Sequence, residues 1–345
     1  MNKLQRGEKV WEIENFHTWS DKHNPKYPKF DIINSSSKVF SIGSCFAEYV
    51  SFFLKSKEID CKHFPDTYHF NPISIEQELI SMFENNTDLT ENIIENNGFF
   101  YNTVRKPSLK FNTFELAKKY ATNIKNTALE QMNLADTIII TLGGIETWKN
   151  LKSNKTCLTI PYPELFNDLK KDLFNFEILT FEDVKKSIIN QIYIINKYLP
   201  NRNIIFTVSP NMMNFTCSDK DITYSTSQSK SILRSAIGEI VSNKDFDNIY
   251  YFHSYELVLY SPLRNDYLNK KGHANELAIN HVMKNFLYFF SHKSLNNSIS
   301  YESLDKNASI NNNFYTKLKF KNYVVSILSF LGIYKFLYKV YMLLR

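Results

Sequence analysis

The stretch KVFSIGSCFAEYV, residues 38–50, decides the fold. It starts with a short apolar run, reaches Gly43, and passes at once into a segment whose apolar residues have helical spacing. A short, bounded apolar run predicts a buried strand, and the segment after it predicts a helix. Ser44 and Cys45 stand at the junction, so this corner either presents a nucleophile or packs two small side chains under the helix.

The same alternation continues along the chain. Short apolar runs predict three more buried strands, at 136–144, 203–210 and 248–254. Helical patterns accompany the strands, at 45–57, 73–84, 113–132, 181–199, 225–242 and 271–290. Strands separated by helices form βαβ units. The sequence therefore predicts an α/β fold, a three-layer α/β/α sandwich with a central parallel sheet.

Two local features complete this outline. Thr180 followed by Asp183 resembles a capping box that opens the helix at 181. The segments 85–112 and 145–180 show neither the apolar runs of strands nor the apolar spacing of helices. We interpret them as irregular insertions that lie over the functional site.

Composition excludes several classes of protein. A chain of 345 residues with 43% hydrophobic side chains is globular and long enough for one large domain or two modest ones. The net charge of +6 is modest, and no dense lysine and arginine run precedes residue 290, so no nucleic acid partner is expected. The four cysteines lack paired spacing, which excludes a tetracysteine zinc site and a disulfide scaffold. His and Cys are too dispersed to predict a metal site.

The two ends of the chain differ from its body. The predicted organisation is an N-terminal extension, an α/β domain, a polar linker and a basic amphipathic helix, at 1–35, 36–290, 291–315 and 316–345. In the last segment Lys321, Lys335 and Lys339 fall near one side of a helical wheel, which favours a helix lying at an anionic membrane surface. Docking on the body or on a second subunit is the alternative. The N-terminus lacks the apolar core of a signal peptide, so the protein is expected to be cytoplasmic and peripheral at the inner membrane.

Polar groups gather where the predicted strands end. Sheets of this class bind ligands at the carboxyl ends of their strands. Four segments stand there: GSC at 43–45, TLGGIETW at 141–148, TVSPNMM at 207–213 and SYE at 254–256. At a strand–helix junction, the helix dipole and the free backbone N–H groups stabilise the negative charge of a thiolate or an oxyanion. This arrangement indicates acyl transfer. The nucleophile needs a base, and His273, which opens the last helix, is the best placed histidine.

Several blocks carry a resemblance to a known family. FSIGSCFAEYV resembles the namesake motif of the GSCFA family, a bacterial group similar to the SGNH/GDSL hydrolases. Other blocks resemble that family in the same order: FNPISI, TLGGIETW, TVSP, SKSILR, YFHSYE and HAN. The resemblance covers roughly residues 36 to 290 and implies an SGNH-like fold with acyl-ester chemistry.

The resemblance also assigns a nucleophile. The SGNH relatives use a Gly-Asp-Ser-Leu motif, which falls on Gly43, Ser44, Cys45 and Phe46. Cys45 then stands at the nucleophile position, and Ser44 stands at the preceding aspartate. Cysteine has a further advantage as a nucleophile, because the pKa of its thiol can be lowered at a helix start. Cys45 is the favoured nucleophile, with Ser44 as the alternative.

One departure concerns the oxyanion. The Gly-x-Asn-Asp block of the relatives falls on residues 143–146, where Ile145 replaces the asparagine and cannot donate a hydrogen bond. The resemblance leaves Gly43, Gly143, the Cys45 backbone N–H and Asn71 as oxyanion or substrate-binding groups.

A second departure concerns the base. Lys270 stands three residues before His273, where the relatives have an orienting aspartate. Glu256 or Glu146 would supply the carboxylate from a neighbouring strand end, or no residue would. Glu146 is also expected among the substrate-binding residues, and a surface ion pair is the alternative for both carboxylates.

The remaining candidates lie farther along the chain. Ser209 and Asn211 follow the third predicted strand, where Ser209 contributes to the substrate site or both shape the turn. Lys230 and Arg234 lie one helical turn apart in SKSILR. They would bind an anionic sugar or phosphate group, with a solvated helix face as the alternative.

These observations predict an SGNH-like acyl-ester enzyme. It would be an O-acyltransferase or esterase that acts on a carbohydrate, a surface polysaccharide or its lipid-linked precursor. No cofactor is expected beyond an acyl donor such as acetyl-CoA, and polysaccharide-assembly proteins are expected partners. The competing prediction is a non-catalytic carbohydrate-binding or scaffold protein, which Ile145 and Lys270 favour.

Overall fold

The computed structural model describes most of the predicted α/β domain. The described residues are 30–84, 89–105, 109–158, 173–243, 245–261, 264–269 and 272–292. The N-terminal extension up to residue 29, and the predicted linker and amphipathic helix from residue 293 onward, lie outside the described residues.

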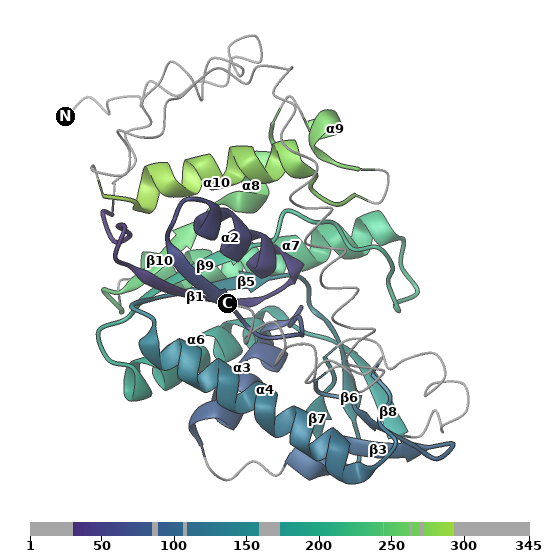
Figure 1. Cartoon of the computed structure of the whole chain (residues 1–345). Helices are drawn as coiled ribbons and strands as arrows, with labels where there is room; N and C mark the ends of the chain where they lie inside the picture. Colours follow the sequence, from purple (N-terminus) through teal and green to yellow (C-terminus); the bar gives the residue numbers. More distant parts are fainter. Residues whose placement is uncertain are drawn as a thin grey trace, which may run out of the picture. The chain divides into compact units, whose positions relative to one another are not determined.

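A parallel sheet of five strands forms the centre of the domain (Figure 1). Its order is β10 (Ile249–Phe252), β9 (Asn203–Val208), β5 (Thr137–Leu142), β1 (Lys38–Gly43) and β2 (Asp60–His63). The prediction of a central parallel sheet is confirmed, and four of its strands match the predicted apolar runs. The fifth strand, β2, was not predicted, because its sequence DCKH contains no apolar run.

Helices cover both faces of the sheet (Figure 1). One face packs against α3 (Pro72–Phe83), α4 (Phe114–Leu134), α6 (Phe181–Tyr198) and α7 (Ile222–Ser242). The other face packs against α2 (Cys45–Ser56), α8 (Ser254–Leu259) and α10 (Glu276–Phe290). Successive side chains of β1 alternate between these layers, with Val39 on the α2 side and Phe40 and Ile42 on the other. The predicted three-layer architecture is therefore confirmed.

The ends of the helices are fixed by local hydrogen bonds. At the start of α6, the Thr180 side chain and Asp183 form the predicted capping box. Thr113 caps α4, and Asn275 caps α10. Each cap satisfies a backbone N–H that has no partner within its helix and stabilises the fold by about 1 kcal/mol.

The two segments predicted to be irregular contain regular structure. The first holds a short 3-10 helix, η2 (Leu89–Asn92), and a hairpin of β3 (Ile93–Asn96) and β4 (Phe99–Asn102). Asn97 and Gly98 both have positive φ, as a tight hairpin turn requires. The second holds an antiparallel sheet of β6 (Glu146–Asn150), β7 (Lys155–Thr156) and β8 (Phe174–Ile178). The prediction was wrong here because these strands are short and only partly buried.

The strand order creates a switch point between β1 and β5. The chain runs from β1 outward to β2, and later strands are added on the opposite side, so connections diverge from this pair. Sheets of this order bind ligands in the crevice outside such a point. The ends of β1 and β5 lie close together, because a Cβ on Gly43 would overlap the Thr141 carbonyl oxygen. Gly43 also has a φ of +131°, a backbone conformation that other residues rarely adopt. Only glycine fits this position, which sets the corner that carries Ser44 and Cys45.

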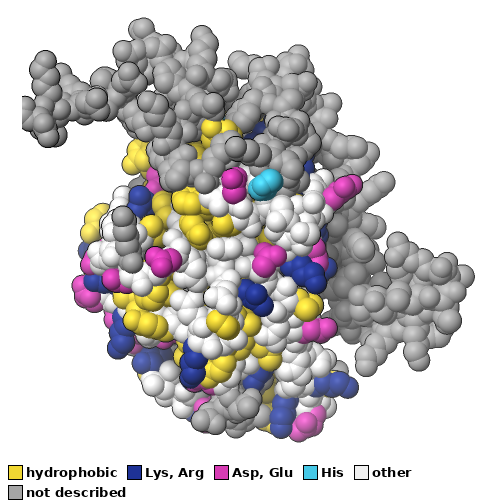
Figure 2. Space-filling model, turned by 90° about the vertical axis from the view of Figure 1, so that its left-hand side faces the viewer, with side chains coloured by type: hydrophobic (Ala, Val, Ile, Leu, Met, Phe, Trp, Pro, Cys, Tyr) yellow, Lys and Arg dark blue, Asp and Glu magenta, His cyan; other side chains and the backbone are white. Residues whose placement is uncertain are grey.

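The surface of the described residues carries charges of both signs. Figure 2 shows a face where lysine, arginine, aspartate and glutamate side chains are interspersed with hydrophobic ones. In the part of the chain that the structure describes, no helix combines the length and apolar character needed to cross a membrane.

Candidate active site

Cys45 lies at the first position of α2, directly after the end of β1. Ser44 is the N-cap, and its hydroxyl accepts a hydrogen bond from the Phe46 N–H at 3.4 Å. The same hydroxyl lies 3.1 Å from the Thr141 hydroxyl, and only 1% of Ser44 is exposed. Cys45 is partly exposed. The capping role holds Ser44 in the corner and leaves Cys45 as the better placed nucleophile.

Asn211 reaches the sulfur of Cys45 from the loop after β9. Its amide nitrogen lies 3.1 Å from Cys45 Sγ, and its oxygen accepts the Ala274 N–H at 2.8 Å. A backbone N–H can only donate, so this bond fixes the amide with its nitrogen toward the sulfur. Asn211 was considered only as a turn residue, because the 166 positions between it and Cys45 hide the contact. Its place just beyond a strand end was the one signal in the sequence.

Ser209 holds the loop that carries Asn211 through two hydrogen bonds. Its hydroxyl accepts a hydrogen bond from the Asn211 N–H at 3.3 Å, and its own N–H donates to the Leu142 carbonyl at 2.8 Å. Only 1% of Ser209 is exposed. The structure thus gives Ser209 a turn-shaping role, and its contribution to a substrate site stays a prediction.

His273 lies next to the residue that holds Asn211. It is partly buried in the turn before α10, and its backbone N–H donates to Asn269 Oδ1 at 3.2 Å. The following residue, Ala274, donates to Asn211, which in turn contacts Cys45. The fold therefore brings the segment that carries His273 to the same strand ends as Cys45, while its role as a base stays a prediction.

The two predicted carboxylates have other partners. Glu256 accepts from Arg234 Nε at 2.6 Å and from the Tyr251 hydroxyl at 2.8 and 2.9 Å. Glu146 accepts from the Thr216 hydroxyl and from the Cys217 N–H at 3.0 Å. Both oxygens of Glu256 thus accept hydrogen bonds within an ion-pair cluster, and its expected link to His273 stays a prediction. Glu146 ties a loop in place instead of forming a surface ion pair.

Two predicted oxyanion groups, Gly143 and Asn71, make hydrogen bonds within the fold. The N–H groups of Gly143 and Gly144 both donate to the Phe70 carbonyl, at 2.8 and 2.9 Å. Asn71 caps α3 through its oxygen, which accepts the Ser74 N–H at 2.9 Å. The Gly143 N–H is thus used within the fold, and Asn211 is the side-chain donor that contacts the sulfur. Ile145 is 1% exposed and belongs to the core.

Lys230 is buried, contrary to a solvated helix face. It is 1% exposed on α7, and its Nζ donates to the Gly143 carbonyl at 2.7 Å. Arg234, one turn later, pairs with Glu256, so the predicted pair does not form one anion site. Burial lowers the pKa of Lys230 to about 7, and the nearby Cys45 opposes this shift.

The charge state of Cys45 depends on several neighbours. Burial raises the pKa of its thiol, the Asn211 hydrogen bond and the Lys230 charge lower it, and Glu48 raises it. Glu48 lies one turn along α2 and accepts from the Tyr68 hydroxyl at 2.6 Å. Burial also lowers the pKa of His63 to about 4, so His63 is neutral near pH 7.

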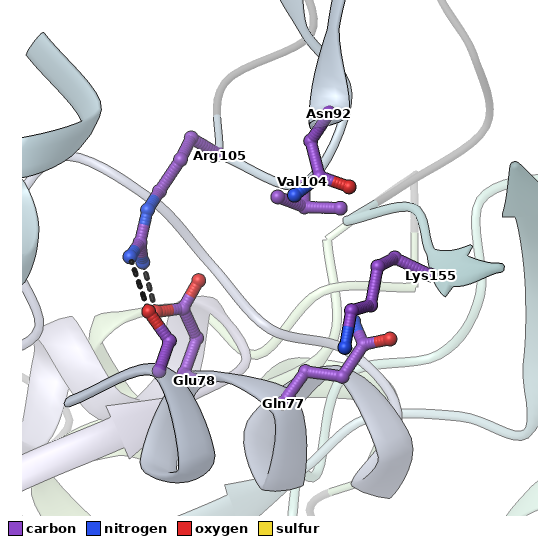
Figure 3. A pocket seen from close by; sticks show the side chains of 7 residues that line it. Gln77, Glu78, Asn92, Val104, Arg105 and Lys155 are labelled. Carbon is purple, nitrogen blue, oxygen red and sulfur yellow. Dashed lines mark hydrogen bonds and ion pairs between the residues drawn. The ribbon is translucent and has the colours of Figure 1, made fainter. Parts of the chain in front are cut away.

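A small pocket lies between α3, β7 and the hairpin region (Figure 3). It is lined by Gln77, Glu78, Ser81, Asn92, Val104, Arg105 and Lys155. Arg105 and Glu78 form a buried ion pair at its edge, and none of its lining residues is a predicted catalytic residue. Among the described residues, no cluster of three or more His, Cys, Asp or Glu side chains could hold a metal ion.

Comparison with known proteins matched the chain to one family model and to several solved structures. The family model described as the GSCFA family matches residues 38–286. One similar structure is the salicylyl-acyltransferase SsfX3 from a tetracycline biosynthetic pathway, at 13% identity and a TM-score of 0.33, covering 74% of this chain and 55% of that one. Another is the acetyl xylan esterase Est2A from the rumen bacterium Butyrivibrio proteoclasticus, at 11% identity and a TM-score of 0.29, covering 64% of this chain and 56% of that one. This chain thus spans little more than half of either structure, and no curated protein matches it.

Proposed function

The chain belongs to the GSCFA family, and we propose that it transfers acyl groups through a covalent intermediate on Cys45. One observation carries the proposal: the sulfur of Cys45, at the start of α2, accepts a hydrogen bond from the Asn211 amide at 3.1 Å. A helix N-terminus and an oriented amide both favour negative charge at this point. Negative charge develops there in both a thiolate and an acyl-transfer transition state.

In the first half of the reaction, Cys45 attacks the carbonyl carbon of an acyl donor. His273 would accept the proton of the thiol as the carbon–sulfur bond forms, and would give it to the leaving oxygen or sulfur of the donor as that bond breaks. The oxyanion would be held by the Cys45 backbone N–H and by Asn211. Once the sulfur is a thioester it no longer needs the Asn211 hydrogen bond, so the amide is available to the adjacent carbonyl oxygen.

In the second half, a sugar hydroxyl or water attacks the thioester. The carbon–sulfur bond breaks, the acyl group passes to the acceptor oxygen, and the sulfur regains a proton. His273, from the segment beside Asn211, would accept the proton of the incoming hydroxyl and give it to the departing sulfur. A sugar acceptor gives an O-acyltransferase, and water gives an esterase.

The finer assignments rest on the family resemblance and on the composition of the chain. We propose a carbohydrate acceptor, an acyl donor such as acetyl-CoA, and attachment to a membrane surface through residues 316–345, which lie outside the described residues. On the same grounds we propose that the protein acts beside polysaccharide-assembly proteins at the inner face of the membrane.

A non-catalytic carbohydrate-binding or scaffold protein is the second candidate. Two observations favour it: Ile145 occupies the position of an oxyanion asparagine as a core residue, and Glu256 is taken by Arg234 and Tyr251. A site that keeps its shape but has lost two chemical groups would bind without turning over.

The test is the intact mass of the protein after incubation with acetyl-CoA and, separately, with p-nitrophenyl acetate. We expect one acetyl adduct, lost in Cys45→Ala and kept in Cys217→Ala, a control that removes another partly exposed thiol. Ser44→Ala should keep the adduct, since Ser44 is a cap. No adduct with either donor, or one that survives Cys45→Ala, would support the binding protein instead.

A further inference from the structure

Two exposed aromatic side chains stand beside the Cys45 corner and are not used by the proposed reaction. Tyr68 and Phe70, in the loop between β2 and α3, are each 36% exposed, whereas His69 between them is fully buried. Their rings are neighbours in an edge contact, with centroids 6.3 Å apart and planes at 66°. Small-molecule sites in proteins are typically lined by aromatic side chains together with a few polar groups.

The backbone of this loop is tied to both strand ends that form the corner. The His69 N–H donates to the Gly43 carbonyl at 2.7 Å, at the end of β1. The Phe70 carbonyl accepts from the N–H groups of Gly143 and Gly144, just after β5. The loop backbone is therefore fixed by the fold, so a ligand that binds the two rings need not order it first.

The Phe70 ring lies close to the corner itself. A Cβ built on Gly143 would lie 3.2 Å from Phe70 Cδ1 and 3.3 Å from the Ser44 Cβ, so the ring and the Ser44 side chain approach the same glycine. Ser44 directly precedes Cys45. A ligand against this ring would therefore lie beside the residue proposed to carry the acyl group.

The Tyr68 ring adds a carboxylate to the same surface. Its hydroxyl donates to Glu48 Oε2 at 2.6 Å. Glu48 follows Cys45 by three positions on α2, a spacing that makes side chains neighbours on a helix. The second oxygen of Glu48, Oε1, lies 3.9 Å from His63 Nε2, which is too far for a hydrogen bond. Because the Glu48 side chain is 20% exposed, this oxygen is able to accept a hydrogen bond from a ligand.

We propose that Tyr68 and Phe70 bind the sugar ring of the acyl acceptor by stacking, and that Glu48 Oε1 accepts a hydrogen bond from one of its hydroxyls. This inference rests on the proposed acyl transfer and deepens it, because it gives the carbohydrate acceptor a place beside Cys45. One face of a pyranose ring consists largely of C–H groups, which are attracted to the negative face of an aromatic ring. The edge of the sugar carries hydroxyls, which donate to a carboxylate.

The Glu48 carboxylate decides between the acceptor and the acyl donor as the occupant. Acetyl-CoA carries several phosphate groups, which the Glu48 charge would repel. A plain acyl chain would remove this charge from water without pairing it, which is costly. A neutral sugar satisfies both the rings and the carboxylate, so the acceptor is the ligand that this surface fits.

The experiment measures sugar binding in the absence of acyl transfer, by saturation-transfer difference NMR on the full chain. The probes are the methyl β-glycosides of glucose, galactose and N-acetylglucosamine, with no acyl donor present. We expect saturation of at least one of these sugars, strongest at the C–H hydrogens of one ring face. Saturation of none of the three sugars, or saturation confined to the glycosidic methyl group, would overturn the proposal.

Matched variants test whether the two rings bind the sugar. Phe70→Leu keeps an apolar side chain but removes the aromatic face, so it should weaken binding on the order of tenfold, and Phe70→Tyr should restore it. Phe99→Leu is the control, because Phe99 is a phenylalanine of similar exposure, 38%, on the hairpin strand β4. Equal binding by Phe70→Leu and Phe99→Leu would overturn the proposal.

Glu48→Gln tests the same surface from α2, and it does so even if the loop variant fails to fold. It removes the charge and keeps the shape of the side chain, so sugar binding should weaken on the order of tenfold. Unchanged binding would contradict the proposed contact with a sugar hydroxyl.

A second measurement tests the acyl chain as the occupant. It compares the rates of acyl-enzyme formation with p-nitrophenyl acetate and p-nitrophenyl hexanoate. A changed preference between the two esters in Phe70→Leu, with sugar binding unaltered, would assign the rings to the acyl chain and overturn the proposal. Sugar binding needs no acyl-enzyme, so the NMR test and the acetyl-adduct test can fail separately.

Discussion

The side-chain amide of Asn211 donates to the sulfur of Cys45 at 3.1 Å, and its oxygen is fixed by the backbone N–H of Ala274. The donor is thus held by the segment before α10 and points toward the sulfur at the start of α2. An oriented amide of this kind needs no reorganisation when charge develops nearby.

Asn211→Ala should slow formation of the acyl-enzyme by on the order of a hundredfold, because it removes one oxyanion donor. The same change should raise the pKa of Cys45, since the Asn211 hydrogen bond lowers it. Rapid-quench mass spectrometry and thiolate absorbance at 240 nm would measure the two effects. Thr216→Ala, in the loop tied to Glu146, is the control; equal losses in both variants would contradict a specific role for Asn211.

Ser44→Ala should lower the stability of the protein and leave formation of the acetyl adduct unchanged. Ser44 caps α2, so its loss should cost about 1 kcal/mol in the free energy of unfolding. Thr113→Ala, which removes the cap of α4, should cost a similar amount. Urea unfolding measures both, and loss of the acetyl adduct in Ser44→Ala alone would make Ser44 the nucleophile.

Gly43→Ala should be strongly destabilising. The added Cβ overlaps the Thr141 carbonyl oxygen, and the φ of +131° is unfavourable for alanine. We expect a loss of about 3 kcal/mol or more, or no folded protein. Gly98→Ala is the matched control, because Gly98 also has a positive φ but an added Cβ there meets nothing within 4 Å. That variant should lose only about 1 kcal/mol, as measured by thermal or urea unfolding.

The stability of the protein should depend on Lys230 and on pH. The folded-state pKa is about 7 and the unfolded value is 10.5, so the unfolded chain binds more protons between these limits. This group therefore makes the folded state less stable as pH falls from about 10 to 7. Lys230→Met removes the effect, so its free energy of unfolding should exceed that of the wild type by a few kcal/mol at pH 7 and by little at pH 10.

Urea unfolding at the two pH values would measure that difference. Lys185→Met is the control, because it shows how the loss of a partly exposed lysine changes the free energy of unfolding. A gap between wild type and Lys230→Met that is the same at both pH values would contradict a buried, neutral Lys230.

His273→Gln and Glu256→Gln should behave differently. The first should slow acyl transfer on the order of a hundredfold, as expected for loss of a general acid and base. The second should weaken the pair with Arg234, a partly exposed contact, and cost no more than about 1 kcal/mol of stability. Single-turnover acetylation would compare them. A parallel loss of activity in Glu256→Gln would restore Glu256 as the partner of His273.

The local sequence predicted most of the framework. The apolar runs gave four of the five strands, because buried parallel strands need continuous apolar residues, and helical periodicity placed the main helices within a few residues. The corner at Gly43 was visible for the same reason. The strand β2 was not, since four residues of mixed polarity carry no periodic signal.

The sequence by itself determined which segments form strands and helices and that Cys45 stands at a strand–helix corner, because backbone periodicity and helix starts are local properties. Only the tertiary structure decided which side chains meet at that corner. Strand order and register bring Asn211 to the sulfur, bury Lys230 against Gly143 and give Glu256 to Arg234. These contacts join residues far apart in the chain, so no local pattern could show them.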